Sequence, residues 1–492
     1  MKIGIIGAGL GGLAVSSLLA SDGHEVAVFE KNASAGGKMN EIRSGGYRFD
    51  TGPSLLTMPH LLEELFAACG RDIAEYLQMS PLEPLCRYFF EDGTRFDNFS
   101  DRDRSMEAIA GIAPGEEEAY QRFLDYSKEL YCKTATAFLY NPLYDFGDLK
   151  NTHPNDFWGI DAFATVSRRV DETFSSPYLR QFFKRFTTYN GSSPYQAPAT
   201  LNVIPHVEIA CGGYYVDGGI YRVAEALCRL AESSGVSFHM NADVTHINTE
   251  SGTVTGIRLD DGKEYPFDIV VSNADAYETY LRLLPEESVG FLRKTILSRT
   301  EPSCSGFVLL LGIDRTYDQL RHHNVFFSND YRTEFRRIFR DRRPPENPTI
   351  YVANTSSVNP AHATEGGSNL FVLVNAPYLS DRFNWEERGR EYGERIKKEL
   401  ERRGLAGLRE TIQFEKQITP RDFYRLYRSN SGSIYGTSSN SRLSAFVRPG
   451  NRSRSVNGLY LVGGSTHPGG GIPLVILSAM HARELIGRYE SR

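Results

Sequence analysis

Hydrophobic and polar positions near the start of the chain follow a strand, helix, strand order. Residues 2–6 form a short β-branched run, and residues 13–20 carry apolar side chains at helical spacing. The Asp22-Gly23 pair ends that helical pattern, and residues 26–29 are a second apolar run. This order predicts a β-α-β unit with two buried parallel strands.

Three glycines separate the first predicted strand from the helix, in the pattern Gly7-x-Gly9-x-x-Gly12. Such glycines permit a tight turn and a close backbone approach to a pyrophosphate, which the helix N-terminus then binds. Glu30 ends the second strand, where an acidic side chain can accept hydrogen bonds from a ribose. Lys2 before an apolar run is also typical of a secretory signal peptide, but that segment needs neither the glycine spacing nor Glu30. A glycine-rich turn without a ligand is the remaining alternative.

Two distant segments repeat the pattern. Residues 212–247 read as a Gly-Gly turn, an amphipathic helix ended by Gly235 and two short strands, and residues 268–275 read as a buried parallel strand. Residues 458–486 read as a strand, a glycine-rich turn and a helix. We expect these pieces to converge on one long ligand.

The segments between them have a different composition. Residues from about 85 to 200 are rich in aromatics with helical periodicity, whereas residues from about 299 to 439 mix strand-like runs with helices. A chain of 492 residues is too long for one ordinary core. We therefore expect a discontinuous nucleotide-binding domain, a helical insertion and a region with a mixed sheet. The nucleotide-binding domain is expected to comprise residues 1–84, 200–298 and 440–492. The helical insertion is expected at residues 85–199 and the mixed-sheet region at residues 299–439.

Charge and composition exclude several classes of protein. The net charge of −6 argues against nucleic acid as a partner, and no long apolar run after the glycine-rich start could span a bilayer. The six cysteines are scattered, which predicts reduced thiols in a cytoplasmic protein and neither a disulfide framework nor a metal site. They are Cys69, Cys86, Cys132, Cys211, Cys228 and Cys304.

Two basic-aromatic stretches, residues 178–186 and 331–343, could meet a membrane surface. A solvated, salt-bridged face is the alternative for both. Phe182, Phe183 and Phe186 could wall a tunnel for an apolar substrate or form an ordinary helix core. We expect a cytoplasmic protein that associates peripherally with a membrane.

The segments Gly36-Gly37-Lys38 and "FDTGPSLLTMP" are similar to a turn of amine-oxidase-like flavoproteins that passes close to the FAD pyrophosphate. The segment "LYLVGGSTHPGGGIP" resembles the C-terminal flavin signature of the FAD-dependent carotenoid desaturases of the bacterial phytoene desaturase type. That resemblance extends over nearly the whole chain. It implies an α/β fold, with a Rossmann-like FAD-binding domain of the amine-oxidase type and inserted helical and mixed-sheet substrate regions.

Within that family, "GGYRFDTGPSLLTMP", "FFSNDY" and "GGSTHPGGGIPL" look most like the hydroxycarotenoid 3,4-desaturases. The resemblance implies dehydrogenation of an acyclic, end-hydroxylated carotenoid, with hydride transfer to flavin N5. The alternatives are a phytoene desaturase and a carotenoid isomerase or oxygenase of the same fold. An amine oxidase and a non-catalytic prenyl-binding protein are further rivals, and the sequence does not define the electron acceptor.

The motifs and the resemblance together define an expected FAD site. Its residues are Gly7, Gly9, Gly11, Gly12, Glu30, Lys31, Gly37, Lys38, Gly52, Pro53, Ser54, Val244, Gly463, Gly464, Gly471, Ile472 and Pro473. The turn Gly463-Gly464-Ser465 lacks the carboxylate that many distant flavoproteins use there, so backbone contacts must hold the ribityl chain. No catalytic residue is assigned. The acidic and basic side chains near these segments, each equally explained as structural, are Asp50, His206, Glu208 and Asp217. Polar candidates for a tunnel end are Tyr189 and Asn190.

Overall fold

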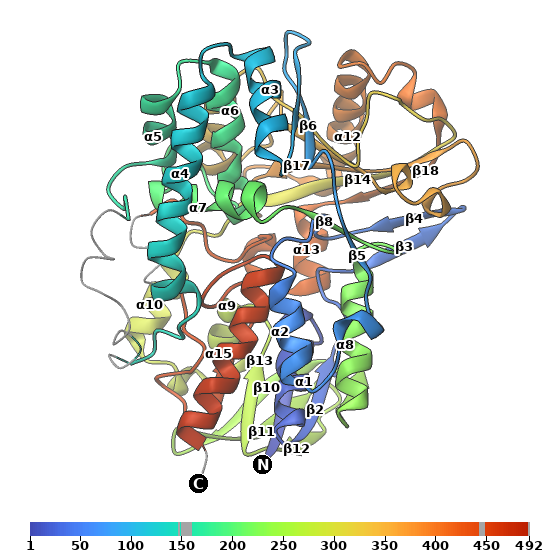
Figure 1. The fold of residues 1–492 in the computed structure, drawn as a ribbon. Coiled ribbons are helices and arrows are strands. Elements are labelled where there is room, and N and C mark those ends of the chain that lie inside the picture. Colours follow the sequence, from blue (N-terminus) through green and yellow to red (C-terminus); the bar gives the residue numbers. More distant parts are fainter. Residues whose placement is uncertain (146–147, 149–159, 442–447, 491–492) are drawn as a thin grey trace.

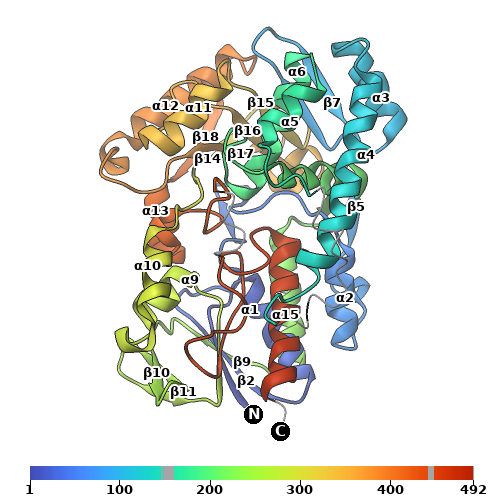
Figure 2. The same cartoon turned by 90° about the vertical axis from the view of Figure 1, so that its left-hand side faces the viewer.

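The computed structural model describes residues 1–145, 148, 160–441 and 448–490. Figure 1 shows two halves, the lower of which holds the start of the chain and its last helix. The upper half holds a second, larger sheet between helices, and Figure 2 shows the same division from the side.

A parallel five-stranded sheet forms the centre of the lower half, in the order β19-β13-β1-β2-β9. Its strands are β1 (Lys2–Ile6), β2 (Glu25–Glu30), β9 (Ser237–Met240), β13 (Ile269–Ser272) and β19 (Leu459–Leu461). Three distant segments of the chain thus build one sheet, as the sequence predicts. Its central strands are almost entirely buried, which explains their continuous apolar runs.

Helices cover one face of this sheet and a small antiparallel sheet covers the other. The helices are α1 (Leu10–Ser21), α2 (His60–Ala68), α8 (Tyr221–Ser233) and α15 (Ile472–Glu490). The small sheet consists of β10 (Val244–Glu250), β11 (Thr253–Leu259) and β12 (Glu264–Pro266). Two short helices follow, α9 (Ala276–Glu278) and α10 (Phe291–Arg299). The helix α8 buries Val223, Leu227 and Leu230, the apolar positions of its helical period.

The upper half contains a seven-stranded sheet in the order β18-β14-β17-β16-β15-β6-β7. All its pairs are antiparallel except β15 with β6. Its strands are β6 (Cys86–Phe89), β7 (Arg95–Asn98), β14 (Ser305–Ile313), β15 (His323–Phe326), β16 (Ile350–Asn354), β17 (Ser368–Ala376) and β18 (Ile412–Ile418). One face packs against α12 (Trp385–Arg402), and the other faces the helical layer and the lower half.

The sheet corrects one feature of the predicted organisation. The strands β6 and β7 come from the region expected to be helical, yet they pair into the sheet of the later region. Each strand has only four residues, too few for its alternation to be distinguished from the helices that follow. The range 85–199 is therefore not purely helical, and part of it lies outside the described residues.

The helical layer that follows β7 consists of α3 (Arg102–Ile112), α4 (Glu117–Thr134), α5 (Val166–Thr173), α6 (Pro177–Lys184) and α7 (Val203–Pro205). Asp101 accepts a hydrogen bond from the backbone N–H of Arg104 and so caps the start of α3. Phe182, Phe183 and Phe186 are at most 1% exposed and stack in the core of this layer. They form helix core and do not line a surface.

Three further elements lie where the two halves meet. They are the hairpin β3 (Glu41–Ser44) and β4 (Tyr47–Asp50), the pair β5 (Met79–Pro81) and β8 (Tyr214–Val216), and the helix α13 (Pro420–Tyr427). The helix α11 (Tyr331–Arg336) belongs to the upper half, where Tyr331 and Phe335 pack in the core of the helical layer (Figure 2). Thr419 and Asp422 form a capping box at the start of α13, with Pro420 at its first position. Within the described residues, no helix combines the length and apolar composition needed to cross a membrane.

Candidate active site

A cavity of about 320 Å³ lies between the two halves, where the carboxyl ends of β1, β13 and β19 meet. Ligands bind at this edge of open parallel sheets because helix N-termini and free backbone groups gather there. Three glycine-rich turns form its floor, and they come from residues 7–12, 36–37 and 463–471. The cavity thus unites segments that are up to 464 positions apart in the printed sequence, as the sequence analysis expects.

The turns touch one another so closely that side chains would not fit. A Cβ atom on Gly11 would lie 3.1 Å from the backbone N of Gly463, and one on Gly37 would lie 3.1 Å from Cα of Gly9. The N–H of Gly36 also donates to the carbonyl of Ala8 at 2.8 Å. Glycine at these positions therefore allows three backbone segments to lie in contact.

Gly12 has a separate, structural reason to be glycine. A Cβ atom there would lie 2.0 Å from the carbonyl oxygen of Gly7, so α1 could not pack against β1. Gly7 itself has a φ of +91°, a conformation that L side chains rarely adopt. The first turn of α1 carries no acidic residue and Gly9 offers no side-chain cap, so the helix start suits an anion.

Glu30 lies at the far end of the cavity with an exposed fraction of 5%. Its carboxylate accepts hydrogen bonds from the backbone N–H of Ala8 at 2.8 Å and of Asn32 at 2.9 Å. These contacts fix the carboxylate at the end of β2, and its oxygens retain lone pairs for a ribose. Lys31 lies at the edge of the cavity and donates to the carbonyl of Arg425 at 2.7 Å.

Two buried cations flank the turns. Lys38 donates to the carbonyl of Ile434 at 2.6 Å, and burial lowers the pKa of its ammonium to about 8. Arg448 donates to the carbonyl of Gly464 at 2.8 Å, and burial lowers its pKa to about 10. Asp275 opposes both shifts electrostatically. A bound pyrophosphate would supply the negative charge that the buried Lys38 lacks.

Sequence reasoning missed several residues of the cavity. Asn273, directly after β13, contacts two of the three turns, because Cβ atoms on Gly9, Gly11 and Gly463 would each lie within 2.8 Å of its amide. Its only sequence signal is its position after a buried strand. The other missed residues that line the cavity include Asp275, Glu278, Arg428 and Tyr435.

Most of the predicted site residues line this cavity. Those that do are Gly7, Gly9, Gly11, Glu30, Lys31, Gly37, Lys38, Gly52, Pro53, Val244, Gly463, Gly464, Gly471 and Ile472. Gly12 supports the turn from inside α1, Pro473 lies in the first turn of α15, and Ser54 bonds to Tyr351 instead. Ser465 stands where many distant flavoproteins have a carboxylate. Its Oγ accepts a hydrogen bond from the backbone N–H of Ala276.

The acidic residues considered as bases have structural partners. Asp50 accepts two hydrogen bonds from Arg48 at 2.7 and 2.8 Å and one from the N–H of Tyr221 at 3.0 Å. Glu208 forms an ion pair with Arg185 at 2.5 Å. These contacts assign both carboxylates to fixed partners, and neither lines the cavity.

The residues fit a long dinucleotide. The cavity lining includes the acidic Glu30, the N-termini of α1 and α15, the cation Lys38, and apolar and aromatic side chains. Among the apolar residues are Val308, Phe371 and Leu373 of the upper sheet. A flat ring system needs such an apolar wall, and phosphates need the donors of the helix N-termini and the cation.

The chain belongs to the flavin-containing amine oxidoreductase family, whose model matches residues 10–486. It is an FAD-dependent oxidoreductase, in agreement with the cavity. It is 38% identical to a 4,4'-diapolycopene oxygenase of Methylomonas sp, over 99% of this chain and 98% of that one. It is 37% identical to a 1-hydroxycarotenoid 3,4-desaturase of Flavobacterium sp. (strain P99-3), over 98% of both chains.

A solved oxidoreductase from Methanosarcina mazei has the same fold, with a TM-score of 0.66 at 17% identity, over 98% of this chain and 100% of that chain. The predicted fold class, cofactor and family resemblance are therefore confirmed. The relatives include both carotenoid oxygenases and a carotenoid desaturase.

Proposed function

We propose that the chain is a carotenoid desaturase that removes two hydrogens from an acyclic carotenoid carrying a hydroxyl near its end. The observation that carries this proposal is the full-length likeness to a 1-hydroxycarotenoid 3,4-desaturase. Two of the motifs that suggested this activity from the sequence, "GGYRFDTGPSLLTMP" and "GGSTHPGGGIPL", contribute residues to the cavity, whereas "FFSNDY" contributes none.

The wall of the cavity supports an apolar substrate. Val308, Phe371 and Leu373 lie on neighbouring strands and face the cofactor end of the cavity. Burial of hydrocarbon contributes about 25 cal/mol per Å², so a long polyene gains most of its binding free energy from such a surface. The sheet face continues beyond the cavity toward the helical layer, where further aromatic side chains are buried.

The proposed reaction needs no strong acid or base from the protein. When bound, FAD supplies a hydride acceptor, while the second hydrogen leaves the substrate as a proton. The positive charge that develops on carbon is stabilised by conjugation with the polyene, so a strong base is unnecessary. The chain's own residues align the carbon chain and exclude water.

Oxygenation of a carotenoid end is the second candidate. It is favoured by the 38% identity to the Methylomonas enzyme and by 35% identity to a 4,4'-diaponeurosporene oxygenase of Staphylococcus haemolyticus (strain JCSC1435). The two activities differ in their products, because desaturation removes two hydrogens and oxygenation adds oxygen from O₂.

The test supplies the purified flavoprotein with phytoene, with a 1-hydroxylated acyclic carotenoid and with the same polyene lacking the hydroxyl. Products are extracted and weighed by mass spectrometry, with labelled O₂ in a parallel sample. Loss of two hydrogens from the hydroxylated substrate supports the proposal. Incorporation of label supports the second candidate, and efficient multi-step desaturation of phytoene contradicts the assigned substrate.

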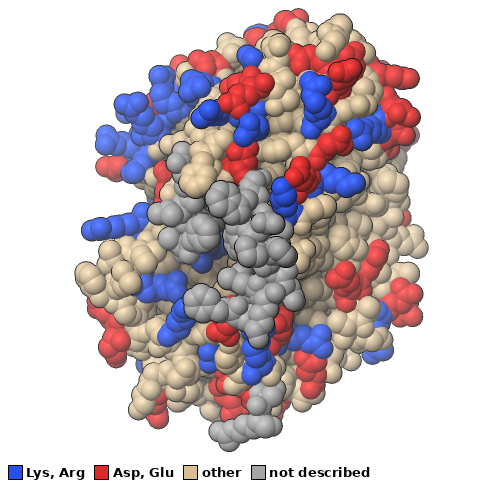
Figure 3. Space-filling model, turned by 60° about the vertical axis from the view of Figure 1, so that its left-hand side comes forward, with Lys and Arg blue, Asp and Glu red and all other residues tan. Residues whose placement is uncertain are grey.

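We also propose peripheral contact with a membrane, from which such a substrate must come. Phe291 and Leu292, at the start of α10, are 85% and 72% exposed and are followed by Arg293 and Lys294. Apolar side chains beside cations suit a lipid headgroup layer. In Figure 3, Lys and Arg side chains also gather at the upper left, on the side where Figure 2 places α11.

The aromatic side chains of the two basic-aromatic stretches, residues 178–186 and 331–343, are not the ones that would contact the membrane. In the stretch that begins at Tyr331, the aromatics are buried and the arginines Arg336 and Arg340 are exposed. The aromatic side chains of residues 178–186 include the buried Phe182 and Phe183. The phenylalanines of both stretches are therefore buried, and only Tyr178 is half-buried at the surface.

Liposome co-sedimentation tests this contact. Replacing Phe291 and Leu292 with Ser should reduce binding to anionic vesicles, whereas Val358→Ser, at another exposed apolar residue, should not. Replacing Arg336 and Arg340 with Glu should reduce binding further, and added salt should do the same. Binding that all these changes leave intact would contradict the proposal.

A further inference from the structure

A row of facing side chains leads across the upper sheet from the cofactor cavity. Leu373 of β17, which lines the cavity, is paired with Tyr351 of β16. Tyr351 is paired with Val325 of β15, and Val325 is paired with Tyr88 of β6. Paired residues share a face of the sheet, and neighbouring strands lie about 4.8 Å apart, so the row extends roughly 15 Å from the cavity wall.

The row contains two tyrosines, Tyr351 and Tyr88, whose hydroxyl groups are polar. Tyr351 Oη lies 2.5 Å from Ser54 Oγ and 2.6 Å from His323 Nδ1. Ser54 directly follows Pro53, a residue of the cavity wall. A short chain of hydrogen bonds therefore begins beside the cofactor cavity and ends at His323.

A buried ion pair lies over the same face. Arg185 Nη2 is 2.5 Å from Glu208 Oε1, and their side chains are 9% and 3% exposed. Tyr189 donates a second hydrogen bond to Glu208. The guanidinium of Arg185 lies 5.1 Å from the ring centre of Tyr88, which joins the pair to the row across the sheet.

Local backbone geometry positions this pair. Arg185 and Tyr189 belong to the 3₁₀ helix Arg185–Asn190, and Glu208 belongs to the π-helical turn His206–Ala210. Such departures from α-helical geometry are frequent at functional sites, because they redirect side chains at a cost in stability. An ion pair buried among aromatics is also expensive compared with apolar packing, so this one needs a reason beyond stability.

Among the side chains just described, three polar atoms remain without a hydrogen-bond partner in the described part of the chain. They are Arg185 Nε, His323 Nε2 and Tyr88 Oη, all in buried side chains, and Tyr88 has the weakly polar thiol of Cys86 near it. Burial, and after it the neighbouring His322 and the guanidinium charge of Arg185, lower the pKa of His323 well below its usual value, which favours a neutral imidazole. The group therefore offers donors and an acceptor to a small polar partner.

We propose that Ser54, Tyr88, Arg185, Glu208, His323 and Tyr351, here called the end-group cluster, bind an oxygen-bearing end of an otherwise apolar polyene. The proposal rests on the proposed function and names the groups that would determine its substrate. A hydroxyl or carbonyl oxygen would accept from Arg185, and a hydroxyl would also donate to His323. A polyene without that oxygen leaves these buried groups unpaired, which a site penalises strongly.

Paired substitutions at His323 separate its two ring nitrogens. His323→Asn retains a polar group where Nδ1 bonds to Tyr351 and removes the Nε2 position, whereas His323→Gln retains the Nε2 position. Tyr351→Phe removes the link to Ser54. Tyr178→Phe is the matched control, because its hydroxyl bonds to Asp92 at the surface of the same helical layer.

The holoenzyme variants are assayed with a 1-hydroxylated acyclic carotenoid and with the same polyene lacking the hydroxyl. We expect His323→Asn and Tyr351→Phe to lose about tenfold or more in kcat/KM on the hydroxylated substrate, with little change on the other. His323→Gln should retain more of the preference than His323→Asn, and Tyr178→Phe should retain all of it. Equal losses on both substrates, or no loss on either, would overturn the proposal, and flavin content and thermal unfolding verify that each variant is folded.

A binding measurement separates this proposal from the proposed function. The holoenzyme is incubated with each polyene in detergent, passed through a size-exclusion column, and its retained pigment is extracted and quantified. Preferential retention of the hydroxylated polyene that His323→Asn abolishes supports the end-group cluster, even where wild-type enzyme converts neither compound. Equal retention of both polyenes by wild type overturns it.

Discussion

Lys38 Nζ donates a 2.6 Å hydrogen bond to the backbone carbonyl of Ile434, which ties a turn of the lower half to the segment after α13. Ile434 and Lys38 both line the cofactor cavity. The ammonium also donates to the carbonyl of Ser433 at 3.4 Å, so it is fixed at two backbone carbonyls and one N–H group stays available to an anion. Burial gives this amine a pKa of about 8, within reach of ordinary assays.

The affinity of the apoprotein for FAD should fall as the pH rises through about 8. Below that pH, Lys38 is charged and attracts the pyrophosphate, whereas above it the neutral amine does not. Binding of the anion favours the protonated amine, so FAD binding and proton uptake are linked. Fluorescence titration of FAD between pH 6 and pH 10 measures the effect.

Two variants at this position provide the contrast. Lys38→Arg retains its charge throughout that range, so its affinity should stay constant with pH, and Lys38→Met should bind FAD weakly at every pH. A Lys38→Met variant with wild-type affinity at pH 7 would show that this cation does not hold the cofactor.

Gly9→Val should abolish FAD binding without unfolding the chain. Gly9 has a φ of −72°, which any residue adopts, so the damage comes from the side chain itself, which meets the amide of Asn273 at 2.6 Å and fills the cavity. Gly487→Ala is the control, because a Cβ there meets nothing within 4 Å and should leave flavin content unchanged or stabilise α15 by up to about 1 kcal/mol. Flavin absorbance per mole of purified protein, with circular dichroism for the fold, decides the result.

The nucleotide-binding half could be read from the sequence because its constraints are local. Gly7 and Gly12 are required by a φ value and by one helix–strand contact within the same β-α-β unit. The helix α1 begins at Leu10, three residues before the predicted apolar period, because Gly11 and Gly12 carry no hydrophobic signal. The apolar period therefore predicted that a helix is present, whereas its first residue depends on backbone geometry that the period does not report.

The rest of the site depends on contacts that sequence spacing does not encode. The partner of Lys38 is 396 positions away along the chain, and β6 pairs with a strand more than 200 positions later. Asn273 lies between the turn of residues 7–12 and the turn that begins at Gly463, and it reaches both only because the folded chain brings these two turns together. Such residues can be assigned to the site only from the folded structure, because their contacts join segments that are far apart in the sequence.

Stability should depend on pH through Glu334, a fully buried carboxyl in α11. Burial raises its pKa from 4.5 to about 7, although hydrogen bonds from Ser328 and Thr349 oppose the shift. Between those two pH values the folded state binds more protons than the unfolded state, so this group's contribution to the free energy of unfolding falls as the pH rises.

Glu334→Gln resembles the protonated side chain and should remove this dependence. At pH 8 the variant should be more stable than wild type by as much as about 3 kcal/mol, and the difference should disappear toward pH 4.5. Urea unfolding of both proteins across this range measures it. A difference in stability that does not change with pH would show that Glu334 titrates normally in the folded protein.

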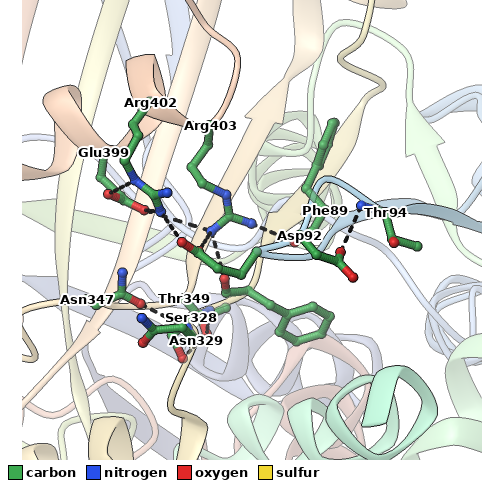
Figure 4. Close-up of polar contacts among 12 residues, drawn as sticks. Phe89, Asp92, Thr94, Ser328, Asn329, Asn347, Thr349, Glu399, Arg402 and Arg403 are labelled. Atoms are coloured by element: carbon green, nitrogen blue, oxygen red, sulfur yellow. Dashed lines mark hydrogen bonds and ion pairs between the residues drawn. The ribbon is translucent and has the colours of Figure 1, made fainter. Parts of the chain in front are cut away.

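Arg403 should contribute far more to stability than its neighbour Arg402. Figure 4 shows both side chains beside the β6–β7 hairpin. Arg403 is 5% exposed and donates to the carbonyls of Phe89 at 2.9 Å and Phe327 at 2.8 Å, so it joins the residue after α12 to the ends of two strands. Arg402 is 49% exposed and pairs only with the carboxylates of Glu399 and Glu91.

Arg403→Met removes the donor of the Phe327 carbonyl and one of the two donors of the Phe89 carbonyl, which also accepts from the N–H of Phe327. This loss should cost about 2–4 kcal/mol in the free energy of unfolding. Arg402→Met breaks exposed ion pairs and should cost less than about 1 kcal/mol. Added salt should reduce the effect of Arg402→Met and leave that of Arg403→Met nearly unchanged, because buried hydrogen bonds are poorly screened. Equal, salt-sensitive losses in urea unfolding would show that Arg403 acts only as a surface charge.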